Sequence, residues 1–245
     1  MTIPEVLRLR RFRVEKIIWE TPLVYTMRLV PCEGETMFVF RAGQWVYLHL
    51  LEPDGTSWGK AAFSIANAPD AAREGFEFGI KVAGELTKRA SHLREGDVVG
   101  VQGPFGVFVL PPELPKALTF FAAGIGISPL RSMIQSLSHH TFPIPVHLFY
   151  SNRTAEDIAY AEEFRLLDRH HANFRCIFTL TKDVPHGWPG ERGRIDGPML
   201  DRSLDDFPSQ RFFMCGPVPF MQNIRELLAE RGVEVKKYLH QELFG

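Results

Sequence analysis

The hydrophobic pattern of this chain changes near residue 110, and that change constrains the fold more than any other feature of the sequence. Before residue 110, short apolar and β-branched runs alternate with turn residues, which is typical of strands. Only one helix is expected in this half, over residues 87–93. We expect strands over 9–18, 23–30, 45–51, 61–65, 76–81 and 98–102. Six short strands and one helix predict a small antiparallel barrel.

After residue 115 the pattern is that of alternating strands and helices. Near-continuous apolar runs alternate with helical patterns, which indicates a parallel sheet covered on both faces. The expected strands are 118–122, 146–150, 176–180 and 212–215, and the expected helices are 130–137, 155–168 and 218–231. Three prolines within residues 110–115 disfavour both kinds of element and mark a linker. We therefore predict a two-domain β plus α/β protein, with a six-stranded antiparallel Greek-key barrel over 1–112 and a parallel-sheet nucleotide-binding domain over 116–245.

The composition excludes several function classes. A formal net charge of -1 gives no general attraction to nucleic acid or to an anionic membrane, so partners must be argued from sites. The three cysteines, Cys32, Cys176 and Cys215, lack the paired spacing of a zinc or iron-sulfur site, so we expect no metal centre. No run approaches the roughly 20 apolar residues of a membrane span, and no signal peptide is recognisable. A cytoplasmic location is expected.

The first strand-to-helix turn of the second half carries a glycine loop. Gly124 and Gly126 lie between a buried strand and a helix, for which Ser128 is expected as N-cap and Pro129 as the first helical residue. Such a loop lets backbone amides and the positive helix end approach a pyrophosphate. The alternative is that the two glycines only make a tight turn.

Two further strand ends belong to the same edge of this sheet, where ligands of open α/β sheets bind. Arg153 follows the strand at 146–150 and is a candidate contact for the adenosine side of a dinucleotide, including a 2'-phosphate. Its alternative interpretation is a solvated loop arginine. Cys215, Gly216 and Pro217 follow the last strand and place a thiol at this edge. A buried, inert cysteine is the alternative there.

The first half holds candidates for a second cofactor site. Phe63, Ser64, Ile65 and Asn67 end one strand, where a hydroxyl beside an aromatic ring suits a flat heterocycle. The segment from Gly84 to Thr87 opens the single helix and can hold a phosphate. The alternative for Phe63 is that it simply belongs to the barrel core.

Seven stretches together resemble, in order and spacing, the ferredoxin-NADP reductase superfamily, and they cover nearly the whole chain. They are FRAGQW, AAFSIAN, GELT, GDVVGVQGPFG, AAGIGISP, MCGP and ELFG. The resemblance implies a flavin-binding barrel followed by an NAD(P)-binding α/β domain, which agrees with the division drawn from the hydrophobic pattern.

The resemblance also implies roles for individual residues. Phe63 and Ser64 would face the isoalloxazine, with Ser64 near N5, and Thr87 would hold flavin phosphate. Gly124, Gly126 and Ser128 would line the dinucleotide site, with Cys215 near the reacting nicotinamide. Glu242 and Phe244 match the family's Glu-x-aromatic ending, which approaches the flavin ring and assists proton movement. A frayed C-terminus is the alternative for these last residues.

One departure from the family pattern concerns the flavin motif. The usual Arg-x-Tyr-Ser stands here as Ala61, Ala62, Phe63 and Ser64. Loss of a charged hydrogen-bond partner costs about 1.5 to 3 kcal/mol, which corresponds to roughly 10- to 150-fold in affinity. We hypothesise that Lys60, Lys88 or Arg89 compensates, although Lys60 points to the opposite face of a regular strand from Ala61.

By this resemblance, NADH or NADPH delivers a hydride to a bound flavin, FAD in preference to FMN, which passes electrons onward. The expected acceptor is a partner redox protein, with a small diffusible acceptor as the other possibility. The absent arginine at Ala61 motivates a different reading, a non-catalytic nucleotide-binding or interaction module derived from the reductases. The sequence does not choose between NADH and NADPH, and it does not define the oligomeric state.

Overall fold

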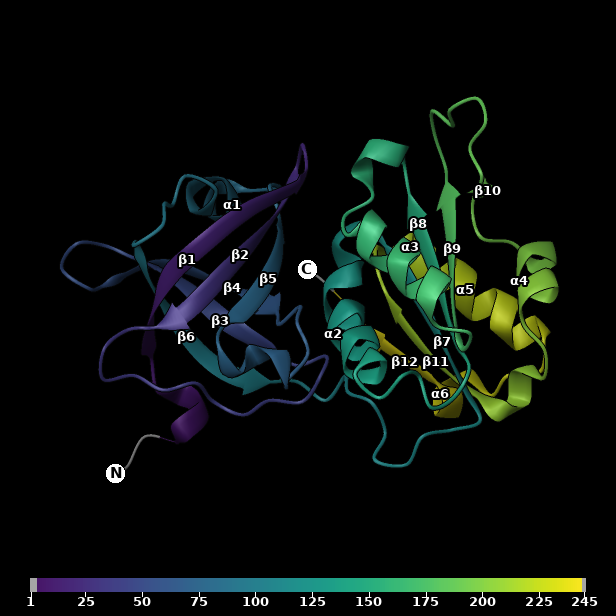
Figure 1. The fold of residues 1–245 in the computed structure, drawn as a ribbon, viewed down its shortest axis with the longest axis horizontal. Helices are drawn as coiled ribbons and strands as arrows, with labels where there is room; N and C mark the ends of the chain where they lie inside the picture. The colour runs from purple at the N-terminus through teal and green to yellow at the C-terminus, as the bar shows by residue number, and fades with distance from the viewer. Residues whose placement is uncertain (1–3, 244–245) are drawn as a thin grey trace. The chain divides into compact units, whose positions relative to one another are not determined.

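A computed structural model describes residues 4–243, and it divides into two compact units (Figure 1). The first unit runs to Leu110 and also includes Arg131–Ser136, and the second contains Pro111–Leu130 and the chain from Leu137 onward. Residues 106–116 form no helix or strand.

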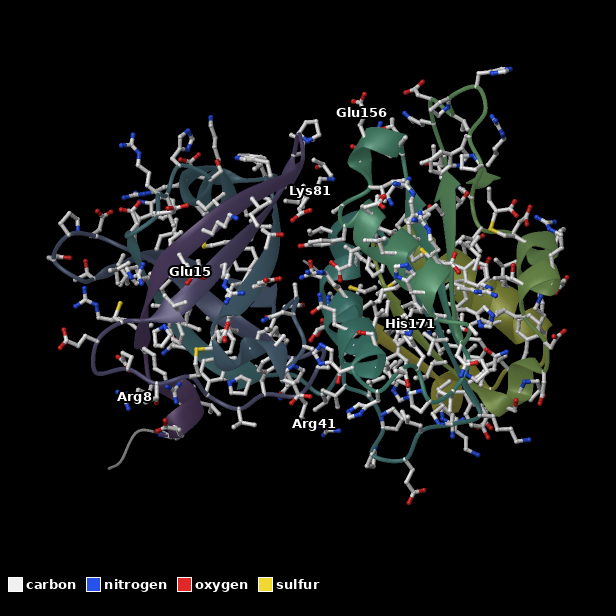
Figure 2. The ribbon with its side chains drawn as sticks, viewed as in Figure 1. Arg8, Glu15, Arg41, Lys81, Glu156 and His171 are labelled. Carbon is white, nitrogen blue, oxygen red and sulfur yellow. The ribbon has the colours of Figure 1, made fainter. Side chains whose placement is uncertain are left out.

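The first unit is built on a six-stranded antiparallel sheet, which confirms the predicted fold class for this half. Its strands are β1 (Arg10–Thr21), β2 (Val24–Pro31), β3 (Trp45–Leu51), β4 (Ser57–Ser64), β5 (Phe76–Lys81) and β6 (Val98–Phe105). The order across the sheet is β4-β3-β6-β1-β2-β5. The short helices are η1 (Glu5–Leu7), η2 (Ala71–Arg73) and α1 (Glu85–Ala90). In Figure 2, Lys81 marks the end of β5, from which the chain continues into α1.

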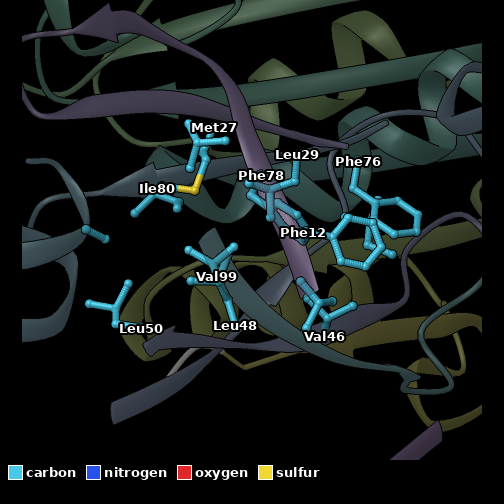
Figure 3. Close-up of a cluster of buried hydrophobic side chains, with 14 of the residues drawn as sticks. Phe12, Met27, Leu29, Val46, Leu48, Leu50, Phe76, Phe78, Ile80 and Val99 are labelled. Atoms are coloured by element: carbon cyan, nitrogen blue, oxygen red, sulfur yellow. The ribbon is translucent and has the colours of Figure 1, made fainter. Parts of the chain in front are cut away.

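One hydrophobic core holds this sheet together (Figure 3). Alternate residues of each strand point inward, as the two-residue period of a strand requires. Phe12, Val46, Phe76 and Val99 are fully buried and come from four different strands. The rings of Phe12 and Phe76 lie 5.4 Å apart. Each such side chain contributes about 1.5 to 3 kcal/mol to stability when it is buried. Burial of these side chains on one face of the sheet therefore stabilises a barrel that encloses them.

Hydrogen bonds link the two edge strands, β4 and β5, near the end of β4. Just beyond the end of β4, the amide of Ala66 donates to the carbonyl of Glu77 (2.7 Å). Asn67 adds two bonds, accepting from the Glu77 amide and donating to the Gly75 carbonyl, each at 2.9 Å. Toward its start, β4 lies beside α1, where a Cβ on Gly59 would be 3.6 Å from the Leu86 side chain. In the described strand order β4 pairs with β3 and is the outermost strand of the sheet.

The second unit is a six-stranded parallel sheet, as predicted. The strands are β7 (Ala117–Ala123), β8 (Val146–Asn152), β9 (Phe174–Leu180), β10 (Glu191–Arg192), β11 (Gln210–Cys215) and β12 (Leu239–Glu242), in the order β10-β9-β8-β7-β11-β12. The helices are α2 (Ile127–Ser138), α3 (Ala161–His170), α4 (Gly197–Ser203), α5 (Val218–Glu230) and α6 (Val235–Tyr238). Single 3-10 turns are η3 (Gly124–Gly126), η4 (Ala155–Asp157) and η5 (Phe207–Ser209).

Helices cover both faces of this parallel sheet. Phe121 and Phe149 stack at 5.3 Å on one face, within a buried cluster that includes Leu200 of α4 and Ile224 of α5. Tyr150 points to the other face, where its ring meets Phe164 of α3 at 6.2 Å. This two-sided cover explains why the sequence of these strands is almost continuously apolar.

The sequence-based helix at 155–168 is wrong in its continuity. The segment forms η4 and then breaks before α3 begins at Ala161. Tyr160 adopts a left-handed backbone conformation with φ of 59°, and Ile158 and Ala159 are buried. Burial of this short stretch stabilises a turn that the helical pattern of the sequence does not reveal. In Figure 2, Glu156 marks η4.

Residues 4–243 contain no helix long and apolar enough to cross a membrane. Within the same range, no three His, Cys, Asp or Glu side chains are grouped so that they could hold a metal ion.

Candidate functional site

The carboxyl ends of the parallel strands bring the predicted nucleotide-site residues of the second unit together. Gly124 follows β7, Arg153 follows β8, and Gly216 follows β11. Because β7 is paired with both β8 and β11, these three strand ends are neighbours at one edge of the sheet. This is the edge at which open α/β sheets bind ligands.

The two glycines of the loop after β7 have different surroundings. Gly124 has a positive φ of 53°, and a Cβ added to it would meet nothing within 4 Å. A Cβ on Gly126 would lie 2.2 Å from the carbonyl oxygen of Cys215 and 3.0 Å from the amide nitrogen of Gly216. Gly124 therefore faces open space, whereas Gly126 allows two backbone segments to touch.

A third glycine completes this contact from the opposite side. A Cβ on Gly216 would lie 2.9 Å from the Ala123 Cβ and 2.9 Å from the ring of Phe220 in α5. The loop after β7 and the loop after β11 are thus closely packed at Gly126 and Gly216. Their close fit fixes the position of Gly124 relative to the end of β11.

Tyr150 supports the Gly124 loop from beneath, a role that sequence reasoning missed. Its hydroxyl donates to the carbonyl oxygen of Gly124 at 3.2 Å. The ring is fully buried, and burial raises the pKa of this hydroxyl well above its usual range. A neutral hydroxyl is the form that donates, so burial favours the bond. Tyr150 is the last residue of an apolar run, and nothing in that run distinguishes it from a core residue.

The helix that follows the loop starts earlier than the sequence predicted. Ser128 is not the N-cap and Pro129 is not the first helical residue, because η3 leads directly into α2 at Ile127. The side chain of Ser128 is buried. Pro129 is still accommodated, because the first-turn amides of a helix have no intrahelical acceptor. The positive end of α2 therefore lies immediately after Gly126.

Two cationic residues are joined through their backbones beyond β8 and β9. Arg153 and Lys182 are both exposed, and the amide of Lys182 donates to the carbonyl of Arg153 at 2.8 Å. Sequence reasoning identified Arg153 and missed Lys182, which is far from it in the chain. Two adjacent cations suit an anionic group such as a phosphate.

Cys215 is fully buried at the end of β11. Burial raises the pKa of its thiol well above the usual range, and the nearby charge of Glu242 raises it further. Glu242 lies opposite Cys215 in the ladder between β11 and β12. The thiol is therefore neutral and is not a nucleophile. Phe244, the other predicted residue of this ending, lies outside the described residues.

In the first unit, the predicted flavin motif lies at the end of β4, the outermost strand of the sheet, and in the residues just after it. Phe63 is half-buried against the barrel core, and Ser64 is 2% exposed. Ile65 is a core residue with no exposed surface, and its amide donates to the carbonyl of Gln44 at 3.0 Å. The side-chain carboxamide of Asn67 links the segment after β4 to Gly75 and Glu77 at the start of β5. The four residues thus form one continuous segment whose side chains differ in how far they are buried.

The segment that opens α1 is shaped by Thr87. The Thr87 hydroxyl accepts from the amides of Ala83 and Gly84, and it donates to the carbonyl of Gly84, each at 3.0 Å. Tyr25 donates its hydroxyl to the carbonyl of Thr87 at 3.3 Å. These bonds fix the turn between β5 and α1.

The structure places the three cations considered as substitutes for an arginine at Ala61. Lys60 lies over the ring of Tyr47 at 4.5 Å, on the face of β4 opposite Ala61. Arg89 lies 4.4 Å over the ring of Trp58 and pairs with Glu52 at 2.9 Å. Lys88 is exposed on α1. Of the three, Lys88 and Arg89 belong to the helix that packs beside β4.

Comparison with known proteins places the chain in a family. Residues 120–226 match the family described as the oxidoreductase NAD-binding domain. The chain is 33% identical over 232 residues to ferredoxin-NADP reductase B of Sorangium cellulosum, covering 91% of this chain and 93% of that protein. It is 29% identical over 239 residues to the glycine betaine monooxygenase reductase subunit of Pseudomonas aeruginosa, covering 95% of this chain but only 63% of that subunit.

Solved structures share the fold. The flavohem-like FAD/NAD-binding domain of nitric oxide dioxygenase from Vibrio cholerae has a TM-score of 0.85 at 20% identity, covering 96% of this chain and 98% of that one. A ferredoxin-NADP reductase from Neisseria gonorrhoeae with bound FAD and NADP has a TM-score of 0.79 at 18% identity, with the same coverage. Because the identity to the Sorangium protein extends over nearly all of both sequences, this chain belongs to the ferredoxin-NADP reductase family of NAD(P)H-dependent flavoprotein reductases.

Proposed function

We propose that this chain takes electrons from NAD(P)H through FAD held along β4 and passes them to a partner redox protein. The observation that carries this proposal is the match to the Sorangium reductase, which includes both the β4 motif and the Gly124 loop.

The residues along β4 fit a flavin. Phe63, on the outermost strand of the sheet, offers an aromatic ring, and Ser64 offers a hydroxyl group beside it. Ala61 and Gly59 are small, and Gly59 lies close to Leu86 on α1, since a Cβ added to it would be 3.6 Å from that side chain. When bound, a flavin accepts two electrons from NAD(P)H and returns them singly or as a pair. The chain's own groups hold and orient it, and Ser64 provides a hydrogen bond near the reacting edge.

The dinucleotide belongs at the carboxyl edge of the parallel sheet. Gly124 presents its backbone to open space, and α2 begins just beyond Gly126, so a pyrophosphate can approach both. Arg153, with Lys182 beside it, lies where an adenosine phosphate would be bound. Cys215, fully buried at the end of β11, packs with its backbone against Gly126, and Glu242 remains a proposed proton-handling group.

The proposed acceptor is a separate redox protein. The Pseudomonas relative is named as the reductase subunit of a monooxygenase, and another relative in fold is the ferredoxin reductase in carbazole 1,9a-dioxygenase. Both names describe proteins that supply electrons to an oxygenase. We extend this class of acceptor to the present chain, with a small diffusible acceptor as the alternative.

An absorption spectrum tests the proposal directly. The purified protein is expected to be yellow, or to become yellow when FAD is added and excess is removed. Under anaerobic conditions the band should bleach with NADH or NADPH, each tested separately. A colourless protein that takes up neither FAD nor FMN would refute the proposal and would favour the nucleotide-binding module that Ala61 suggests.

A further inference from the structure

Trp58 lies at the start of β4, at the opposite end from the flavin motif. We propose that its indole is the binding platform for the adenine ring of FAD. This inference rests on the proposed function and deepens it, because it selects FAD over FMN and identifies the residue responsible for the preference.

The residues of β4 match the shape of FAD from one end to the other. Phe63 supplies an aromatic ring, Ala61 and Gly59 are small, and Trp58 supplies a second ring. FAD has the same order, since its isoalloxazine and adenine are joined by a slim ribityl-diphosphate chain. At about 3.3 Å per residue, Phe63 and Trp58 are separated by roughly 16 Å along the strand. That spacing leaves room for the diphosphate chain between the two rings.

A bulge presents Trp58 at this position. In the ladder between β3 and β4, Leu50 pairs with Gly59 and Leu51 pairs with Ser57, so Trp58 is the extra residue. A bulge re-aims the side chain that it carries. Trp58 is thereby placed beside α1, and 39% of its surface is exposed.

Two charged residues hold the indole in place. The Arg89 guanidinium lies 4.4 Å over the ring, and Glu52 holds that guanidinium at 2.9 Å. A ring already fixed in its binding orientation loses little conformational freedom when a ligand stacks on it. A solvent-exposed tryptophan with one face packed against a fixed cation is well suited to stack on a flat base.

The test measures affinity with two flavins that differ in the adenine. Flavin is removed from the full chain, and FAD and FMN are titrated separately while the quenching of flavin fluorescence is followed. Base-aromatic stacking predicts that Trp58→Ala weakens FAD binding by about 5- to 150-fold. FMN lacks adenine, so its dissociation constant should change by less than about twofold. Trp58→Phe should recover most of the FAD affinity because it keeps a ring.

Trp19 offers a matched control. It is another exposed tryptophan of the same unit, 52% exposed, on β1 at a distance of three strands from β4 in the sheet order. Trp19→Ala should leave both affinities unchanged. Equal weakening of FAD and FMN in Trp58→Ala, unchanged FAD binding in that variant, or an equal FAD loss in Trp19→Ala would each overturn the inference.

The same titration separates this inference from the proposed function. If the wild-type chain binds FAD and FMN equally well, the adenine platform is wrong while the flavoprotein assignment stands. If the wild-type chain binds neither flavin, the proposed function itself fails. Circular dichroism of each variant shows whether a loss of binding reflects unfolding.

Discussion

Replacement of Gly126 by alanine should destabilise the second unit through a backbone clash. The new Cβ would lie 2.2 Å from the Cys215 carbonyl oxygen, whereas ordinary contacts begin at 3.4 Å. The difference, 3.4 minus 2.2, requires the two loops to separate by about 1.2 Å. The nearest atoms belong to the backbones of Cys215 and Gly216 and cannot rotate away. We therefore expect a loss of stability at the upper end of the range for overpacked cores, about 3 kcal/mol.

Gly124→Ala is the matched control because it lies in the same loop. No atom lies within 4 Å of its added Cβ, so the substitution adds only the strain of a positive φ, about 1 to 2 kcal/mol. The two variants should therefore differ in whether they mainly reduce dinucleotide binding or mainly reduce the stability of the protein. Gly124→Ala places a methyl group where the dinucleotide is proposed to bind and should raise its Michaelis constant about tenfold or more. Gly126→Ala should mainly lower the melting temperature.

Thermal unfolding and steady-state kinetics on both variants measure these effects. A loss of 3 kcal/mol in a protein of this size lowers the melting temperature by roughly 6 to 12 °C. A Gly126→Ala protein that melts within about 2 °C of wild type would refute the close packing of the two loops. An unchanged Michaelis constant in Gly124→Ala would remove that residue from the dinucleotide site.

Three other predictions follow from side chains of both units. If Arg153 contacts a 2'-phosphate, Arg153→Ala should raise the Michaelis constant for NADPH at least tenfold more than that for NADH; equal effects would exclude it from dinucleotide selection. Because burial raises the pKa of the Cys215 thiol, iodoacetamide should label Cys215 in the native protein at pH 8 at least 100-fold more slowly than in denaturant, as mass spectrometry can show, and rapid native labelling would contradict this. Burial, together with the charge of Lys60, lowers the pKa of His49 despite its bond to Gln102, so its neutral form stabilises the fold above about pH 6.5. This contribution should be lost as the pH falls through the lowered pKa, and chemical denaturation of His49→Gln should show a flatter acid limb than wild type.

The sequence predicts most of the strands because their hydrophobic periods are strong. β3 and β5 have the bounds expected from alternation alone. β10 and β12 were missed for a physical reason: they have two and four residues, are polar, and lie at the edges of the sheet. An edge strand gains its backbone bonds from a neighbour that is distant in sequence, and no local pattern records this.

The site shows the same division between local and long-range information. The strand-loop-helix pattern locates Gly124 and Gly126, but the different surroundings of the two glycines depend on Cys215, which follows much later in the chain. The support from Tyr150 and the proximity of Lys182 to Arg153 likewise arise from the order of parallel strands. Ser128 was misassigned because a 3-10 turn through the glycines carries the chain into α2 without a separate cap.

The outer border of β4 has a consequence for self-association. A strand with unsatisfied backbone groups on one side invites pairing with a second molecule, and proteins oppose this with bulges and lysines. β4 has both, since Trp58 interrupts its regular ladder and Lys60 adds a charge two residues later. These features discourage the addition of another polypeptide strand at this border.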